Sequence, residues 1–309
     1  MKSVKILFAI VMCLLLATGA WATDFTIFFA SEMHYPGGMI TDRSRAGVQA
    51  MNNLPGMAWP YGTVPTPSAF IACGDLADGG AWGTTYASDA PQWYTNRNYT
   101  HQWNGFDYNF PLYGVQGDNN RLRYPRYAVP GNHDWWRWCG YTLGTSQWVA
   151  TKLKAQYGNC NSTNGNVYYS FNIDGIHFAA LGRYPDSYVL SWLANDLAGV
   201  GTDTPVILFM HYALNDDEEW WSYAQRQLLA NAIAGYNVIA ILHGHTHSTT
   251  HYTWNGYDVY DDGALTEYGG VNVMHITDTT IDTAHYSANV DGNGNWSGGG
   301  WLWSYQKTY

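Results

Sequence analysis

The histidine-rich segment HGHTH, at residues 243–247, has the residue types and spacing of a metal-binding loop. It follows an apolar run at residues 238–242 that is typical of a buried β-strand. A glycine at the end of such a strand lets the backbone approach closely, and the loop leaves the imidazoles of His245 and His247 available for coordination. The segment therefore predicts a metal site at a strand end. His243, the last residue of the strand, is expected to support the ligands or to pack beside them.

Four other short segments repeat this layout of an apolar run that ends in polar residues able to bind a metal. The apolar runs are at residues 25–30, 69–73, 127–129 and 206–210. The polar residues that follow them are, in chain order, Glu32 and His34, then Asp75, then Asn132, His133 and Asp134, and finally His211. A mixture of carboxylate, amide and imidazole groups suits metals such as Mn, Fe and Zn.

The order of these segments resembles the calcineurin-like metallophosphoesterases, whose pattern is Asp-x-His, Gly-Asp, Gly-Asn-His-Asp/Glu, His and Gly-His-x-His. The resemblance extends over roughly residues 25–276. It implies an α/β fold, a four-layer αββα sandwich of two mixed sheets flanked by helices. One motif departs from the family, because Glu32 stands where the family has Asp. We expect Glu32 to remain a metal ligand, since it carries the same carboxylate on a side chain one methylene longer.

The resemblance also implies a role for each polar residue. Two metal ions, of Fe, Mn or Zn, would be bridged by Asp75 and by a hydroxide that attacks the phosphorus. The other ligands would be Glu32, His34 and His247 for the first ion, and Asn132, His211 and His245 for the second. His133 would donate a proton to the leaving group, and Asp134 would orient His133.

These roles imply a phosphoesterase that hydrolyses phosphomonoesters or phosphodiesters of a small molecule, a lipid or a nucleotide. Asp78 stands where purple acid phosphatases have Tyr, which indicates the non-purple branch. Trp135 and Tyr212 follow ligand segments and either line a substrate pocket or pack beneath the loops. One alternative, motivated by Glu32, is a degenerate member that binds a partner with one metal or none. Another is a carbohydrate-binding protein, suggested by an aromatic content of 17% beside 12% charged residues.

The first 22 residues have the composition of a secretory signal peptide. Lys2 and Lys5 precede an apolar stretch at residues 6–17, and a small-residue site predicts cleavage after Ala22. We therefore expect a secreted or periplasmic protein with no transmembrane segment. Removal of two lysines and no acidic residue changes the formal charge from -10 to -12, which argues against nucleic-acid binding.

The remaining chain is predicted to be one metallophosphoesterase domain, residues 23–290, with an aromatic-rich insertion at about residues 79–126. A Gly- and Asn-rich C-terminal segment, residues 291–309, follows, and its first part to residue 300 is expected to be flexible. Helical periodicity predicts helices at residues 43–54, 146–157, 187–197 and 220–234. An Asn-Gly pair at residues 255–256 predicts a hairpin turn.

Three cysteines remain after cleavage of the signal peptide. Cys73 lies in an apolar run and is expected to be buried. Cys139 and Cys160 are then the predicted disulfide, because an oxidising compartment favours pairing.

Overall fold

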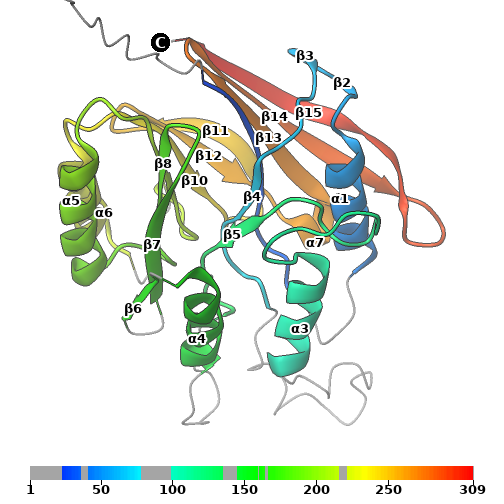
Figure 1. Ribbon diagram of the computed structural model, residues 1–309, viewed down its shortest axis with the longest axis horizontal. Helices are drawn as coiled ribbons and strands as arrows, with labels where there is room; N and C mark the ends of the chain where they lie inside the picture. Colours follow the sequence, from blue (N-terminus) through cyan, green and yellow to red (C-terminus); the bar gives the residue numbers. More distant parts are fainter. Residues whose placement is uncertain are drawn as a thin grey trace, which may run out of the picture.

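The protein is described here by a computed structural model that covers residues 23–35, 41–77, 99–134, 145–158, 160–163, 166–215 and 221–308. Two mixed β-sheets stack face to face, and helices lie on their outer faces (Figure 1). This is the α/β sandwich that the family resemblance implies. Among the residues covered, no helix is both long and apolar enough to cross a membrane.

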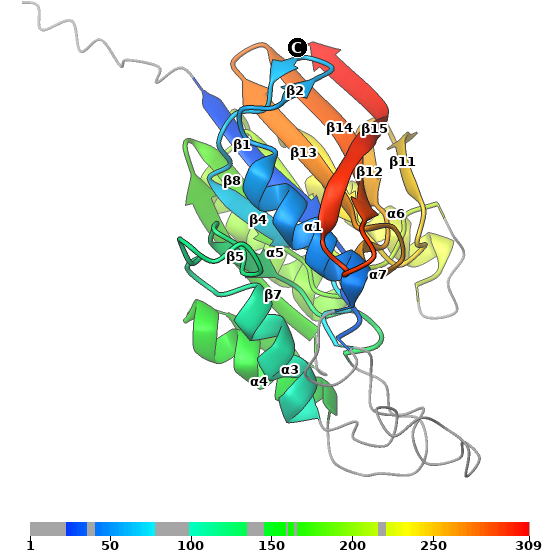
Figure 2. The same cartoon turned by 90° about the vertical axis from the view of Figure 1, so that its right-hand side faces the viewer.

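The six-stranded sheet carries the first ligand segments. Its strands, in spatial order, are β15 (Trp296–Thr308), β14 (Thr280–Val290), β13 (Gly270–Thr277), β1 (Asp24–Ala30), β4 (Ala69–Ala72) and β5 (Arg126–Ala128). Strands β1, β4 and β5 are parallel, so their carboxyl ends meet at one edge of the sheet. Helix α1 (Asp42–Asn53) crosses the outer face of this sheet, with the short helix α7 (Leu265–Tyr268) against it (Figure 2). Helix α3 (Tyr99–Asn109) precedes β5 in the chain.

The seven-stranded sheet carries the other ligand segments. Its strands, in spatial order, are β11 (Thr249–Trp254), β12 (Tyr257–Asp262), β10 (Val238–His243), β9 (Val206–Phe209), β8 (Ile176–Ala180), β7 (Asn166–Ile173) and β6 (Asn161–Thr163). Strands β12, β10, β9 and β8 are parallel. Helices α5 (Ser187–Val200) and α6 (Tyr223–Ile233) cover its outer face (Figure 1). Helix α4 (Thr145–Tyr157) packs against β6 and β7, and β2 (Ala58–Trp59) and β3 (Gly62–Thr63) form a separate small hairpin.

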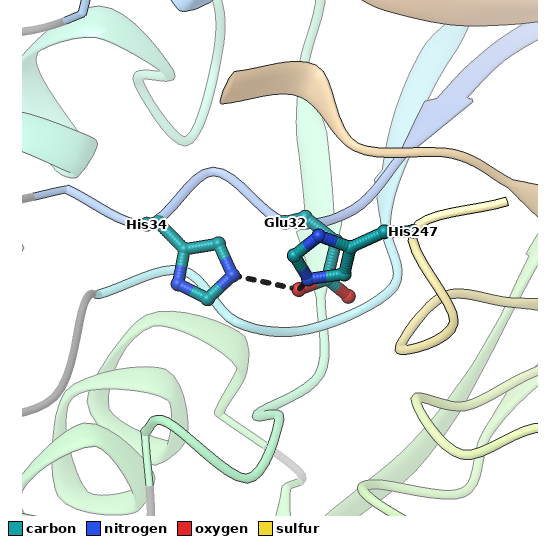
Figure 3. Close-up of side chains that lie close together, drawn as sticks. All are labelled: Glu32, His34 and His247. Carbon is teal, nitrogen blue, oxygen red and sulfur yellow. Dashed lines mark hydrogen bonds and ion pairs between the residues drawn. The ribbon is translucent and has the colours of Figure 1, made fainter. Parts of the chain in front are cut away.

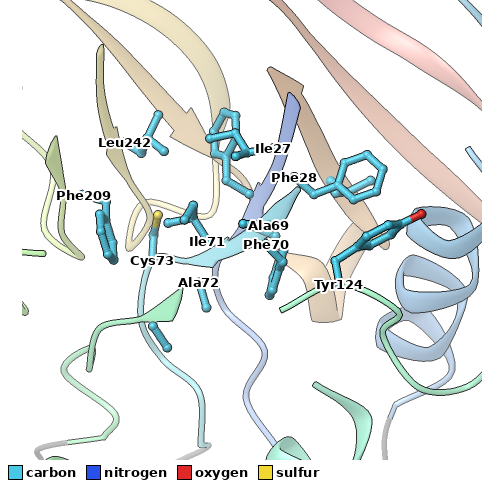
Figure 4. Packing of buried hydrophobic residues seen from close by; sticks show 14 of the residues in the cluster. Ile27, Phe28, Ala69, Phe70, Ile71, Ala72, Cys73, Tyr124, Phe209 and Leu242 are labelled. Carbon is cyan, nitrogen blue, oxygen red and sulfur yellow. The ribbon is translucent and has the colours of Figure 1, made fainter. Parts of the chain in front are cut away.

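The core lies between the sheets and consists of aliphatic and aromatic side chains from both. Ile27 and Ile71 from the six-stranded sheet share one buried cluster with Phe209 and Leu242 from the other (Figure 4). The central strands are covered on both faces, which explains why β4 and residues 27–30 of β1 are continuous apolar runs rather than alternating ones. Close packing of this kind gives the strand ends a rigid base.

Most of the predicted elements are confirmed. The four helices expected from periodicity are α1, α4, α5 and α6. Asn255 and Gly256 join β11 to β12 with φ angles of 48° and 86°, as a tight hairpin turn requires.

The prediction of a flexible segment at residues 291–300 is wrong over its second half, because strand β15 begins at Trp296 and pairs with β14. The glycines in this segment permit a close strand approach. A Cβ on Gly299 would lie 2.7 Å from the ring of Tyr286. The aromatic residues Trp301 and Trp303, further along β15, pack against the core and hold the strand in place.

Several predictions concern residues outside the described part of the chain. They are the signal peptide at residues 1–22, Asp78, on which the assignment to the non-purple branch depends, residues 79–98 of the insertion, Trp135 and Cys139. The later part of the insertion contains helix α3. Cys160 is buried and forms no disulfide with a described residue. The pairing of Cys139 with Cys160 therefore stays a prediction.

Candidate metal centre

The strand ends bring the predicted ligands together at one edge of the sandwich. The residues follow β1 (Glu32, His34), β4 (Asp75), β5 (Asn132), β9 (His211) and β10 (His245, His247). Segments that are distant in the sequence are joined here by backbone hydrogen bonds. The amide of Glu32 donates to the carbonyl of Gly74, and that of Gly244 donates to the carbonyl of His211. The sheets thus position both halves of the ligand set.

One group of ligand atoms surrounds the carboxylate of Glu32. Its Oε2 lies 2.8 Å from Nε2 of His34 and 3.2 Å from Nε2 of His247. Figure 3 shows the two rings beside this carboxylate. The ligand atoms of these three residues all lie within 4.8 Å of one another, so they could hold one cation. Asp75 Oδ2 is 3.8 Å from the same nitrogen of His34. The geometry brings together the residues predicted for the first ion.

A second group of ligand atoms surrounds the amide of Asn132. Its Oδ1 lies 2.7 Å from Nε2 of His211 and 3.0 Å from Nδ1 of His245. Asp75 Oδ2 is 3.5 Å from the same nitrogen of His211. One oxygen of Asp75 therefore faces both groups, which is the position predicted for a bridging carboxylate.

The backbone at the site adopts an unusual conformation. Five of the predicted ligands have left-handed φ angles, namely Glu32 (55°), His34 (41°), Asp75 (50°), His245 (74°) and His247 (56°). The other non-glycine residues with positive φ in the described part of the chain are Asp174 and Asn255. A left-handed residue other than glycine costs roughly 1–2 kcal/mol. Such a concentration of strained residues is characteristic of a functional site that the surrounding structure holds in place.

The glycines of three motifs permit a close approach between ligand loops. A Cβ on Gly74 would lie 2.5 Å from Nδ1 of His211, and one on Gly131 would lie 2.7 Å from Cγ of Asp75. A Cβ on Gly244 would lie 3.0 Å from Oε1 of Glu32. Any larger residue at these positions would displace a predicted ligand. This steric limit explains why glycine stands at these three positions.

The two carboxyl groups at the centre influence each other strongly, because both are buried. Burial opposes the ionisation of Glu32, but the imidazoles of His211, His247 and His34 outweigh it and hold the pKa of Glu32 well below its usual value. Burial and the charge of Glu32 raise the pKa of Asp75 well above its usual value. The ionised carboxylate of Glu32 therefore disfavours ionisation of Asp75. A divalent cation beside these groups would allow both to ionise, and their donor atoms suit Mn, Fe or Zn.

His211 is poised to coordinate through a single nitrogen. Its Nδ1 lies 2.9 Å from the carbonyl oxygen of Cys73, and because a carbonyl can only accept, Nδ1 carries the proton. Burial lowers the pKa of His211 to about 3, so the ring is neutral at neutral pH. Its Nε2 lone pair therefore points at Asn132 and Asp75, as a metal ligand requires.

His133 and Asp134 follow Asn132 but differ in their surroundings. The backbone amide of His133 donates to Oδ1 of Asp75 over 2.8 Å, and its ring centroid lies 4.4 Å from that of His34. The carboxylate of Asp134 accepts hydrogen bonds from the amides of Leu76 (3.0 Å), Ala77 (2.9 Å) and Gly131 (2.8 Å). Burial outweighs these bonds and raises the pKa of Asp134 to about 6. Asp134 thus joins two ligand loops, and its predicted effect on the His133 ring stays a prediction.

Two further predicted residues lie beneath the ligand loops. Tyr212 is only 2% exposed, and its ring packs edge-on against His245 at 4.5 Å and stacks on Tyr184 at 5.6 Å. The packing role is therefore favoured over substrate contact for Tyr212. His243 is buried between the hydroxyl of Tyr252 (2.8 Å) and the carbonyl of Gly244 (2.9 Å), in the supporting position that the sequence predicts.

Sequence reasoning missed two supports of the site. Oε1 of Glu267, in helix α7, lies 2.8 Å from Nδ1 of His247. The Ser31 hydroxyl donates to the buried carboxyl group of Asp262 and lies 3.1 Å from the carbonyl of Gly263. Neither Glu267 nor Asp262 belongs to a motif, and only the adjacency of Ser31 to Glu32 could have pointed to this support.

Comparison with known families agrees with the site. The sequence model of the Metallophos family, described as calcineurin-like phosphoesterase, matches residues 27–249. The chain belongs to the calcineurin-like phosphoesterase family. The matched residues include every predicted metal ligand, from Glu32 to His247.

Solved structures agree with the calcineurin-like fold. A structure of PhoD has a TM-score of 0.56 at 11% identity, covering 93% of this chain and 70% of that one. GAP50, described as the anchor in the inner membrane complex of Plasmodium, has a TM-score of 0.58 at 12% identity, covering 93% and 89%. At these identities the likeness shows the fold alone.

A curated relative is Purple acid phosphatase 22 of Arabidopsis thaliana, which is 30% identical over 95 residues. The match covers 28% of this chain and only 22% of the relative. Because Asp78 lies outside the described residues, assignment to the non-purple branch stays a prediction.

Proposed function

We propose that this calcineurin-like protein is a secreted phosphoesterase that binds two metal ions and hydrolyses phosphomonoesters or phosphodiesters. The observation that carries the proposal is the position of Asp75, whose Oδ2 lies 3.8 Å from Nε2 of His34 and 3.5 Å from Nε2 of His211. One carboxylate oxygen between two groups of imidazole and amide ligands is the arrangement that a pair of ions needs. When bound, such ions would polarise the phosphate ester and lower the pKa of a water molecule.

The residues of the chain would contribute in distinct ways. Asp75 and Glu32 would supply negative charge to the ions, while Asn132 supplies a neutral oxygen that keeps the centre from repelling a phosphate ester. Gly74 and Gly131 allow the ligand loops to approach each other. His133 would donate a proton to the leaving-group oxygen as the P–O bond breaks. Its backbone bond to Asp75 supports this position, since it ties His133 to the centre without using the ring.

The substrate class follows from charge and chemistry. A net charge of -10 disfavours a long polyanion such as a nucleic acid. Small phosphate esters, including those of lipids or nucleotides, remain suitable because the ions would neutralise a single phosphate locally. Secretion is proposed from the signal-peptide composition of residues 1–22.

A second candidate function is that of a binding protein that keeps the fold without turnover. One observation motivates it: Glu32 replaces the family's Asp. Against this candidate, Glu32 Oε2 lies 2.8 Å from Nε2 of His34, so the longer side chain reaches the ligand group.

A metal add-back assay separates the two candidates. The protein would be stripped with a chelator, supplied with Mn, Zn, Fe or Co in turn, and assayed on para-nitrophenyl monoesters and diesters. The phosphoesterase proposal expects two ions per chain and hydrolysis that depends on the added metal. One ion or none, without turnover for any metal, would favour the binding protein. The same panel reports the preference for monoesters or diesters.

A further inference from the structure

Helix α7 is attached directly to the segment that carries Glu32. The amide of Leu265 donates to the carbonyl of Ser31 over 3.1 Å, and that of Thr266 donates to the carbonyl of Glu32 over 3.2 Å. The Thr266 hydroxyl reaches the same carbonyl over 2.9 Å. A residue on α7 is therefore held in a fixed position relative to the first ligand group.

Glu267 is the acidic residue of this helix, and its carboxylate faces one nitrogen of a ligand. Oε1 lies 2.8 Å from Nδ1 of His247, while Nε2 of the same ring lies 3.2 Å from Oε2 of Glu32. A carboxylate accepts only, so the bond to Glu267 places the proton on Nδ1 and leaves Nε2 for coordination.

His247 needs such support more than His211 does. Its side chain is 36% exposed, whereas that of His211 is fully buried and has a backbone carbonyl on Nδ1. His247 also has a left-handed backbone, with φ of 56°. Without a partner on its second nitrogen, a partly exposed imidazole on such a loop would be free to rotate.

We propose that Glu267 is a positioning residue for the first metal ion, acting through the His247 ring. This inference rests on the proposed function, because it assumes that His247 binds a metal. An isolated surface ion pair contributes little to stability, so Glu267 should matter little for folding. A carboxylate behind a ligating histidine typically changes metal affinity by about 10- to 100-fold. The two effects can therefore be separated.

The test measures the dissociation constants of Mn²⁺ by chelator competition, without any substrate. Glu267→Ala should weaken one ion by about 10- to 100-fold and leave the other within twofold. Glu267→Gln should weaken the same ion less, because its amide oxygen still accepts the bond but lacks the charge. Asn132→Ala removes a ligand of the second site and so identifies which ion belongs to the first. The ion weakened by Glu267→Ala should be the one that Asn132→Ala retains.

Asp203→Asn is the matched control, because Asp203 is an exposed acid in the turn before β9, where its carboxylate contacts Thr202. It should change neither dissociation constant, and all variants should keep the parent's melting temperature in chelator. The inference would be overturned if both Mn²⁺ dissociation constants of Glu267→Ala stayed within twofold of the parent's, or if both ions were weakened equally. Either result would leave the proposed function intact. A parent protein that binds no metal would overturn both.

Discussion

Gly131→Ala should displace the central carboxylate without disturbing the fold. An added Cβ would lie 2.7 Å from Cγ of Asp75 and closer still to its Oδ1 and amide nitrogen. Carbon atoms in contact lie about 3.5–4.0 Å apart, so Asp75 or the Gly131 loop must move by about 1 Å. The φ angle of Gly131 is not in the left-handed region, so alanine itself suits the backbone. The clash alone carries the effect.

A shift of about 1 Å at a catalytic group can cost on the order of 10²-fold in rate. We therefore expect Gly131→Ala to lose about 10²-fold in kcat/KM and to weaken both metal ions, because Asp75 faces both groups. Metal content and hydrolysis of a para-nitrophenyl ester measure the two effects on the same sample. Thermal unfolding in chelator reports whether the variant is folded.

Gly199→Ala provides the control. Gly199 lies in α5, away from the site, and an added Cβ would meet nothing within 4 Å. Gly199 is the penultimate residue of α5, where alanine is at least as favourable as glycine, so this variant should melt at or slightly above the parent's temperature and keep the parent's rate. If Gly131→Ala kept two ions and a rate within threefold of the parent's, the steric account of the motif glycines would be refuted.

Three further predictions concern single residues. His133→Ala should keep both ions and lose about 10²- to 10⁴-fold in rate with a poor leaving group, but less with para-nitrophenolate; equal losses would contradict the proton-donor role. Glu32→Ala should weaken one ion, whereas Glu32→Asp should hold both; parent-like metal binding and turnover in Glu32→Ala would make the carboxylate a bystander. Burial lowers the pKa of His285 from 6.5 to about 4, so the folded protein binds this proton more weakly than the unfolded chain does, and acid stabilises the unfolded chain. The contribution of His285 to the free energy of unfolding in chelator should fall by about 1.4 kcal/mol per pH unit as the pH drops from 6.5 towards about 4. The free energy of unfolding of His285→Gln should decline less steeply with falling pH. A slope equal to the parent's would contradict the lowered pKa of His285.

The grouping of the candidate ligands was implied by the family resemblance, and each motif lies shortly after an apolar run that forms a strand. Strands β1, β4 and β5 are parallel, so the segments that carry Glu32, Asp75 and Asn132 leave the six-stranded sheet at one edge. The burial of Cys73 was also predictable, because it continues an apolar run.

The supports of the site could not be predicted in the same way. Glu267 lies in a helix of four residues, too short for a periodic pattern, and its contact with His247 depends on the path of the chain after β12. Strand β15 was not predicted, because glycine usually signals flexibility, whereas here Gly299 makes room for the ring of Tyr286. Local composition does not report such tertiary contacts.

The most direct test of the central claim is anomalous scattering from crystals grown with Mn²⁺. The proposal expects two peaks about 3.5–4 Å apart, with Asp75 in contact with both ions, His34 and His247 on one side and Asn132 and His211 on the other. A single peak, no peak, or two ions of which Asp75 contacts only one would contradict it.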